Sequence, residues 1–164
     1  MNIYQALPTP QSIRVLSLKR RVSGIEETLK HLKISTTGLE IPVHDPTAQA
    51  IHCEMSVISL TDPESFDALS YVWGNPTVNV QYMVCNGSDP VPITFNLWTA
   101  LHQIWEKWPH KRLWVDAICI NQRDIPERNQ QVTMMGSIYS SAQSLYGLAR
   151  GRRRAKSSLG SSRK

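Results

Sequence analysis

One segment constrains the fold of this 164-residue chain more than any other. Residues 113–122 read Leu-Trp-Val-Asp-Ala-Ile-Cys-Ile-Asn-Gln, an apolar run interrupted by Asp116 and ended by two amides. The run predicts a strand over 112–121 that is covered on both faces, as in a parallel sheet. A strand that served packing alone would not contain a carboxylate, because burial of an unpaired charge is expensive. We therefore expect Asp116 to be mostly buried and hydrogen-bonded, in a structural or a catalytic role.

A helix is expected directly after this strand. Asp124 and Glu127 stand three residues apart, the spacing of a capping box, and Pro126 is tolerated in a first helical turn. Apolar residues recur at helical spacing as far as residue 142, which predicts a helix over about 125–142. Two roles stay open for Glu127, a partner in the helix cap or a general base. The positive end of this helix would favour an anion such as a phosphate.

An earlier segment repeats the design. Residues 68–76 read Ala-Leu-Ser-Tyr-Val-Trp-Gly-Asn-Pro, an apolar strand stopped by a turn. If strands 68–73 and 112–121 are parallel neighbours, both turns lie at the carboxyl end of the sheet, where open α/β sheets bind ligands. Gly74 there allows a positive φ or a close backbone approach. The candidate ligand-binding or motif residues are Tyr71, Trp73, Gly74, Asn121, Gln122 and Asp124.

Each candidate also has a structural alternative. Trp73 is either a core aromatic or a wall on which a base stacks. Asn121 and Gln122 either tie their loop or donate to a ligand. Cys119 is expected to be a small buried residue rather than a nucleophile. Neither of the two segments described above, which we term the signature segments, contains a histidine to activate it.

The other elements complete an α/β pattern. Strands 13–18 and 51–60 are expected to pair antiparallel, strand 78–85 ends at an Asn86-Gly87 turn, and a helix runs from an Asn96 N-cap to Lys107. Residues 19–50 are expected to be a mobile insertion. Only a faint strand signal follows residue 142, so strand 112–121 is expected to lack one neighbour. We predict a mixed, largely parallel sheet flanked by helices.

Composition narrows the class of protein. Three cysteines without paired spacing predict reduced thiols in an intracellular compartment and no metal site, and no apolar run is long enough for a membrane span. The net charge of +5 is concentrated in residues 150–164, which hold seven of the 18 basic residues. Without them, 11 basic and 13 acidic residues remain, a net charge of −2. The tail, 147–164, is expected to be disordered, and it is the one segment suited to nucleic acid or nuclear import.

The two signature segments, with Asn96 to Leu101 between them, resemble the fungal HET (heterokaryon incompatibility) domain. The family pattern reads A-L-S-Y-x-W-G, then N-L-x-x-A-L, then L-W-[IV]-D-x-[IL]-C-I-N-Q-x-D-x-x-E-R, and this chain has each block in order. The resemblance covers residues 13–146 and implies a partial HET domain, incomplete at its C-terminus.

The resemblance implies a cytoplasmic module of non-self recognition that triggers programmed cell death. It would act by self-association or with other death-signalling proteins, without a membrane. HET domains are held to be distantly similar to Toll/interleukin-1 receptor domains, some of which cleave NAD. The alternative is therefore an enzyme that cleaves NAD or another nucleotide, with Asp116 or Glu127 as the catalytic carboxylate. An inactive, truncated paralogue is a third alternative.

Overall fold

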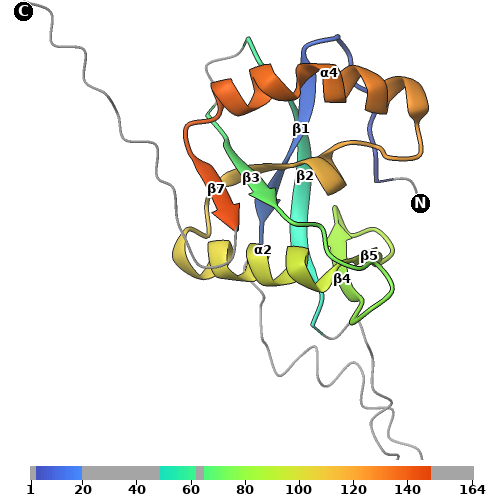
Figure 1. Ribbon diagram of the computed structural model, residues 1–164, viewed down its shortest axis with the longest axis vertical. Coiled ribbons are helices and arrows are strands. Elements are labelled where there is room, and N and C mark those ends of the chain that lie inside the picture. The colour runs from blue at the N-terminus through green and yellow to red at the C-terminus, as the bar shows by residue number, and fades with distance from the viewer. Residues whose placement is uncertain (1–2, 20–48, 62–64, 149–164) are drawn as a thin grey trace, which may run out of the picture.

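The computed structural model describes residues 3–19, 49–61 and 65–148 (Figure 1). In this part of the chain, seven strands form one sheet in the order β5-β4-β2-β1-β6-β3-β7. The strands are β1 (Ser12–Leu18), β2 (Ile51–Ser59), β3 (Asp67–Tyr71), β4 (Gln81–Cys85), β5 (Val91–Ile93), β6 (Arg112–Val115) and β7 (Leu145–Leu148). The helices are α2 (Phe95–Lys107), the short α3 (Asp116–Cys119) and α4 (Ile125–Ser141). The prediction of a mixed α/β fold is confirmed.

The sheet is less parallel than the sequence suggested. β2–β4, β3–β6 and β3–β7 are parallel, whereas β1–β2, β1–β6 and β4–β5 are antiparallel. The antiparallel first pair and the parallel neighbours β3 and β6 were both expected. The expectation of a largely parallel sheet is wrong, because β1 pairs antiparallel with both of its neighbours.

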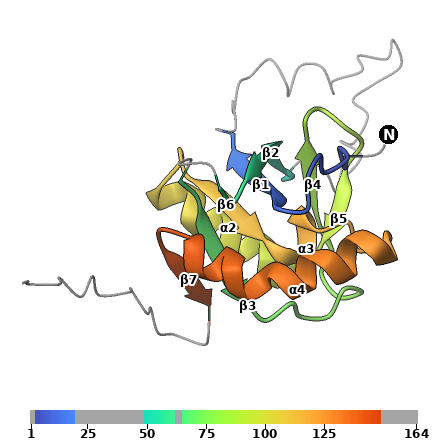
Figure 2. The same ribbon diagram turned by 90° about the horizontal axis from the view of Figure 1, so that it is seen from above.

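The two longer helices cover opposite faces of the sheet (Figures 1 and 2). Ala68 of β3 pairs with Trp114 of β6, so both side chains project from one face. The Trp114 ring meets Tyr139 of α4 edge-on at 5.3 Å between centroids. Tyr71 projects from the other face and hydrogen-bonds to Thr94, which caps α2. The carboxyl ends of β3 and β6 therefore emerge between two helical layers.

The strand expected over residues 112–121 is shorter than predicted. β6 ends at Val115, and Asp116 begins α3 instead of continuing the strand. The Asp116 carboxylate accepts from the next backbone amide, Ala117 N, at 2.7 Å, and the Cys119 thiol accepts from Val115 N at 3.3 Å. These local bonds turn the chain, because a short acidic side chain competes with the sheet for backbone donors.

Three further expectations are corrected. β6 has two neighbours, β1 and β3, so the expected exposed edge is absent from it. β7 develops from the faint signal near residue 145 and pairs with β3 along four residues. The N-cap of α2 is Thr94, whose hydroxyl accepts from Leu97 N, and Asn96 lies inside the first turn of that helix.

The expected mobile insertion lies mostly outside the described residues, as does the basic tail.

Candidate functional site

The two signature turns meet at Asp116. β3 and β6 are parallel, so their carboxyl ends lie at the same edge of the sheet. The Trp73 indole N–H donates to Asp116 Oδ2 at 3.1 Å, and Gln122 Nε2 donates to the Asp116 backbone carbonyl at 2.9 Å. One residue from each turn is thus bonded to the same aspartate. The sequence prediction that the turns lie side by side is confirmed.

Asp116 is half-buried rather than mostly buried, which corrects that part of the prediction. Burial raises the pKa of its carboxyl above the ordinary value, while the bonds from Trp73 and Ala117 act in the opposite direction. Its charge also contributes, after burial, to raised pKa values at Tyr71 and Tyr139. These tyrosines belong to opposite faces of the sheet, so Asp116 stands at the edge between them with an indole and two phenols nearby.

Gly74 and Asn96 fix the first turn. Gly74 has a φ of +78°, and a Cβ built on it would lie 2.7 Å from Asn96 Nδ2. The same amide donates to the Val72 carbonyl at 3.0 Å. Both reasons proposed for a glycine at this position, a positive φ and a close approach, are therefore found. Asn96 serves as the tie between the turn and α2.

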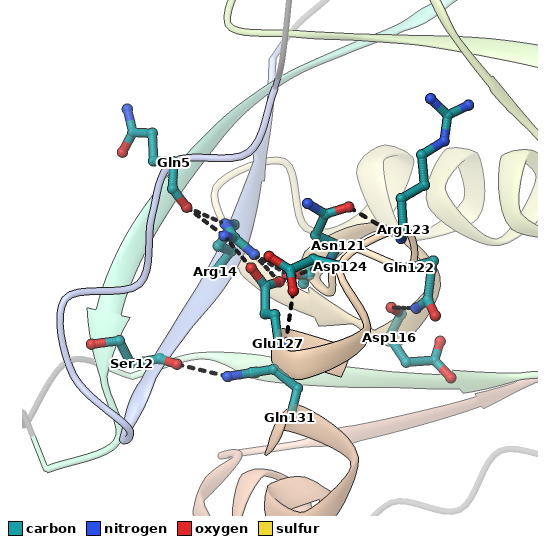
Figure 3. A network of polar contacts seen from close by, with 11 residues as sticks. Gln5, Ser12, Arg14, Asp116, Asn121, Gln122, Arg123, Asp124, Glu127 and Gln131 are labelled. Atoms are coloured by element: carbon teal, nitrogen blue, oxygen red, sulfur yellow. Dashed lines mark hydrogen bonds and ion pairs between the residues drawn. The ribbon is translucent and has the colours of Figure 1, made fainter. Parts of the chain in front are cut away.

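Glu127 is held by a buried arginine, away from Asp116. Arg14 of β1 is 1% exposed and donates to both carboxylate oxygens of Glu127, at 2.5 Å and 2.9 Å. Glu127 Oε1 also accepts from Asn121 N at 2.8 Å. Burial raises the pKa of Glu127, but the bonds from Arg14 and Asn121 outweigh it and leave the pKa below the ordinary value. Figure 3 shows the Asp116 carboxylate directed away from this ion pair.

The arginine also braces the rest of the second turn. Arg14 Nη1 donates to the Cys119 carbonyl at 3.2 Å, and its guanidinium donates to the carbonyl of Gln5. The Tyr4 ring lies 5.1 Å from the guanidinium carbon. Arg14 therefore joins the N-terminal segment, the end of α3 and the start of α4.

The other predicted residues of the second turn serve the backbone. Asp124 caps α4 by accepting from Glu127 N at 3.1 Å, which confirms half of the expected capping box. Asn121 Oδ1 accepts from Arg123 N at 3.2 Å. Of the predicted site residues, the structure thus brings Tyr71, Trp73, Gln122 and Asp116 together. Asn121 and Asp124 instead bond to backbone amides of the second turn, and Glu127 bonds to Arg14.

Arg14 and Tyr139 were not among the predicted site residues. A signal for Arg14 was present, because it is the one charged residue between apolar neighbours in Ile13-Arg-Val-Leu. A buried charge needs a partner in this strand as much as it does at Asp116. Tyr139 occupied an apolar position of the expected helix and gave no separate sign.

Two other properties bear on the class of site. Within the described ranges, every helix is too short or too polar to cross a lipid bilayer. The same ranges hold no group of three or more His, Cys, Asp or Glu side chains placed to ligate a metal.

Comparison with known proteins gives the family. The model of the family described as "Heterokaryon incompatibility protein (HET)" matches residues 66–163, which is more than half of the chain. Heterokaryon incompatibility protein 6, OR allele, of Neurospora crassa is 36% identical over 103 residues, covering 56% of this chain and 15% of that protein. This chain thus corresponds to a small part of that relative, and no solved structure matches it. The family match includes Trp73, Asp116 and the turns around them, so the chain belongs to the heterokaryon incompatibility (HET) family.

Proposed function

We propose that this chain is a signalling module of fungal non-self recognition that acts by binding a second copy of itself through the Trp73 turn. The relative in Neurospora crassa is named for heterokaryon incompatibility, and the matched region includes this turn. The observation that supports self-association is a set of exposed apolar side chains at the carboxyl end of the sheet.

This set, which we term the turn patch, consists of Val72, Trp73 and Phe95. Their exposed fractions are 70%, 46% and 45%, which is unusual for large apolar residues on one small area. Asn96 ties Val72 to the start of α2, so the patch is held by a hydrogen bond and not by chance proximity. Trp73 is fixed further by its bond to Asp116. A rigid, apolar surface with a central tryptophan is the usual core of a protein interface.

The charge at the second turn favours a protein partner over a nucleotide. The first turn of α4 is already capped by the Asp124 carboxylate, and Glu127 follows in the same turn. The Asp124 carboxylate opposes an approaching phosphate, whereas the charge of Glu127 is balanced by Arg14. The anion site expected from the helix dipole is thus occupied by the protein's own side chains.

The test is a charge substitution within the patch, next to Trp73, with a matched control. Val72→Asp is expected to abolish self-association in analytical ultracentrifugation and to abolish killing when the protein is expressed in a fungal host. Val132→Asp is the control, because Val132 is 53% exposed on α4 and lies outside the patch. The control is expected to keep both properties. Equal behaviour of the two variants would refute the proposal.

A second candidate function rests on Asp116. A half-buried carboxyl with a raised pKa, bonded to an indole and flanked by phenols, has the environment of a general acid or base. The corresponding enzyme would cleave the glycosidic bond of NAD or a similar nucleotide, with the Trp73 ring beside the base. Glu127 is the weaker candidate for this role, because Arg14 and Asn121 hold both of its oxygens.

The two functions give opposite results for cellular NAD. Death with NAD intact supports the binding module. Early loss of NAD that Asp116→Asn abolishes, at an equal protein level, supports the enzyme and overturns the primary proposal. Gln122→Ala is a useful companion variant, since it removes a bond to the Asp116 backbone and leaves the carboxylate in place.

A further inference from the structure

Two buried thiols lie in contact at the other side of the sheet. Cys53 of β2 and Cys85 of β4 are 3% and 0% exposed, and their sulfur atoms are 2.9 Å apart. The two residues are direct partners in the register of the parallel pair β2–β4. Both are free thiols. No local pattern pointed to this pair, because 32 positions separate the two residues.

Asn86 fixes the register that brings the sulfurs together. Its Oδ1 accepts from Met55 N at 2.9 Å, and its Nδ2 donates to the Met55 carbonyl at 3.2 Å. Its backbone N–H donates to the Cys53 carbonyl at 3.0 Å. The residue directly after Cys85 is thus bonded to Cys53 itself and to Met55, two positions further along β2. A slip of β4 along β2 would break all three bonds, so the contact between the thiols is a fixed feature of the fold.

We propose that Cys53 and Cys85 form an oxidation site that a peroxide converts to a disulfide. The Cys85 thiolate attacks one peroxide oxygen, the O–O bond breaks, and hydroxide leaves as the sulfenic acid forms. The Cys53 sulfur then attacks the Cys85 sulfur, the S–O bond breaks, and water leaves. The two thiols lose two protons and two electrons, one proton converts the hydroxide to water, and one hydrogen peroxide is thereby reduced to two waters. The sulfurs need to approach by less than ~1 Å to reach the length of a disulfide bond.

The order of these steps follows from the hydrogen bond between the thiols. With Cys53 as donor, its bond to Cys85 and its burial raise the pKa of Cys53, and the same bond lowers the pKa of Cys85. Cys85 is therefore the sulfur that ionises first and attacks. Cys119 offers a contrast, since burial raises its pKa to about 12 and its thiol bonds to the backbone of β6.

Oxidation would tie two parts of the sheet together. Residues 53–85 would become a closed loop that contains β3 and the Trp73 turn. A cross-link of this length restricts the unfolded chain, which stabilises the folded state. The outer hairpin of β4 and β5 is near one edge of the sheet, so its opening gives a small oxidant access without global unfolding.

The test is to treat the folded 164-residue chain with dilute hydrogen peroxide, quench it, alkylate the remaining thiols in denaturant, and map the cysteines. Cleavage after glutamate separates all three thiols, into peptides 41–54, 65–106 and 107–127. The expected product is a cross-link between the first two peptides with Cys119 still alkylated. The melting temperature of the oxidised chain is expected to rise by roughly 5–10 °C and to return on reduction.

Cys119→Ala is the matched control, because it removes a thiol that is also buried, at 1% exposure. It is expected to keep the cross-link, whereas Cys53→Ala and Cys85→Ala lose it. The proposal is overturned if Cys53 and Cys85 stay alkylated after the treatment, if the cross-link involves Cys119, or if only the guanidinium-unfolded chain forms it. Because the wild-type map is decisive by itself, a variant that fails to fold does not weaken the test.

Discussion

The ion pair between Arg14 and Glu127 predicts a large and specific loss of stability. Glu127→Ala would leave the Arg14 guanidinium, 1% exposed, without its anionic partner. Breaking a buried pair from one side costs about 3–5 kcal/mol, because the remaining charge stays out of water. Glu127 itself is 13% exposed, so we take the lower end, about 3 kcal/mol. The melting temperature should fall by roughly 6–12 °C for a chain of this size.

The assay is urea unfolding followed by tryptophan fluorescence, with Glu54→Ala as the control. Glu54 pairs with Lys19 on the surface, where the two side chains are 60% and 50% exposed. Exposed pairs contribute little, so the control should lose less than about 1 kcal/mol. A loss in Glu127→Ala no larger than in the control would refute the argument that Arg14 depends on this carboxylate.

The same pair predicts a dependence on pH. The folded pKa of Glu127 is lowered from its ordinary value of 4.5, so its contribution is complete above that value. It is lost as the pH falls through the lowered folded pKa, when the carboxyl gains its proton in the folded state too. The stability difference between wild type and Glu127→Ala should therefore be constant near neutral pH and shrink in acid. A difference that stays constant down to pH ~2 would contradict the shift.

Two more predictions concern the candidate site. Gly74→Ala should destabilise the fold by about 1–3 kcal/mol, because it combines a positive φ with a clash against Asn96, whereas Gly136→Ala in α4 meets open space and should stabilise slightly. Thermal melts of the two variants compare them directly, and an unchanged Gly74→Ala would rule out the clash. Asp116→Asn should change stability near neutral pH by less than about 1 kcal/mol, because removal of a charge that burial opposes offsets the loss of one accepted bond: the single amide oxygen can accept from Trp73 or from Ala117 N, not from both. A fall of more than about 1 kcal/mol in urea unfolding would show that the folded state needs the charge.

The residues of the candidate site could be predicted from the sequence more completely than the points at which the strands end. The two turns, Gly74, the Asp124 cap and the α4 helix follow from local rules, since glycine, capping residues and helical periodicity act within a few residues. The end of β6 did not follow, because an apolar run predicts a strand whether or not the chain turns inside it. Here the Asp116 side chain accepts from the next backbone amide and the strand ends. A pattern of apolar residues does not show whether a backbone amide bonds locally or to a neighbouring strand.

Contacts between residues far apart in the sequence could not be predicted either. The direction of β1 against β6 and the partner of Arg14 depend on segments about a hundred positions apart, which no local pattern encodes. The short strand β5 contains Pro92, and proline argues against a strand except at an edge, which is where β5 lies. The contact between Cys53 and Cys85 was hidden for the same reason as the Arg14 pair.

The strand order has a consequence for how the chain folds. β1, the first strand made, lies between β2 and β6, and both partners of β3 follow it in the sequence. Of the described strands, β1, β2, β4 and β5 can therefore assemble early during synthesis, while β3 waits for β6. The Arg14–Glu127 pair, 113 positions apart, closes later still. Contacts of such long range slow folding, because the chain loses loop entropy before it gains any pairing. The Trp73 turn, which depends on β3, is thus among the last surfaces to form, so a partly synthesised chain would not yet present it.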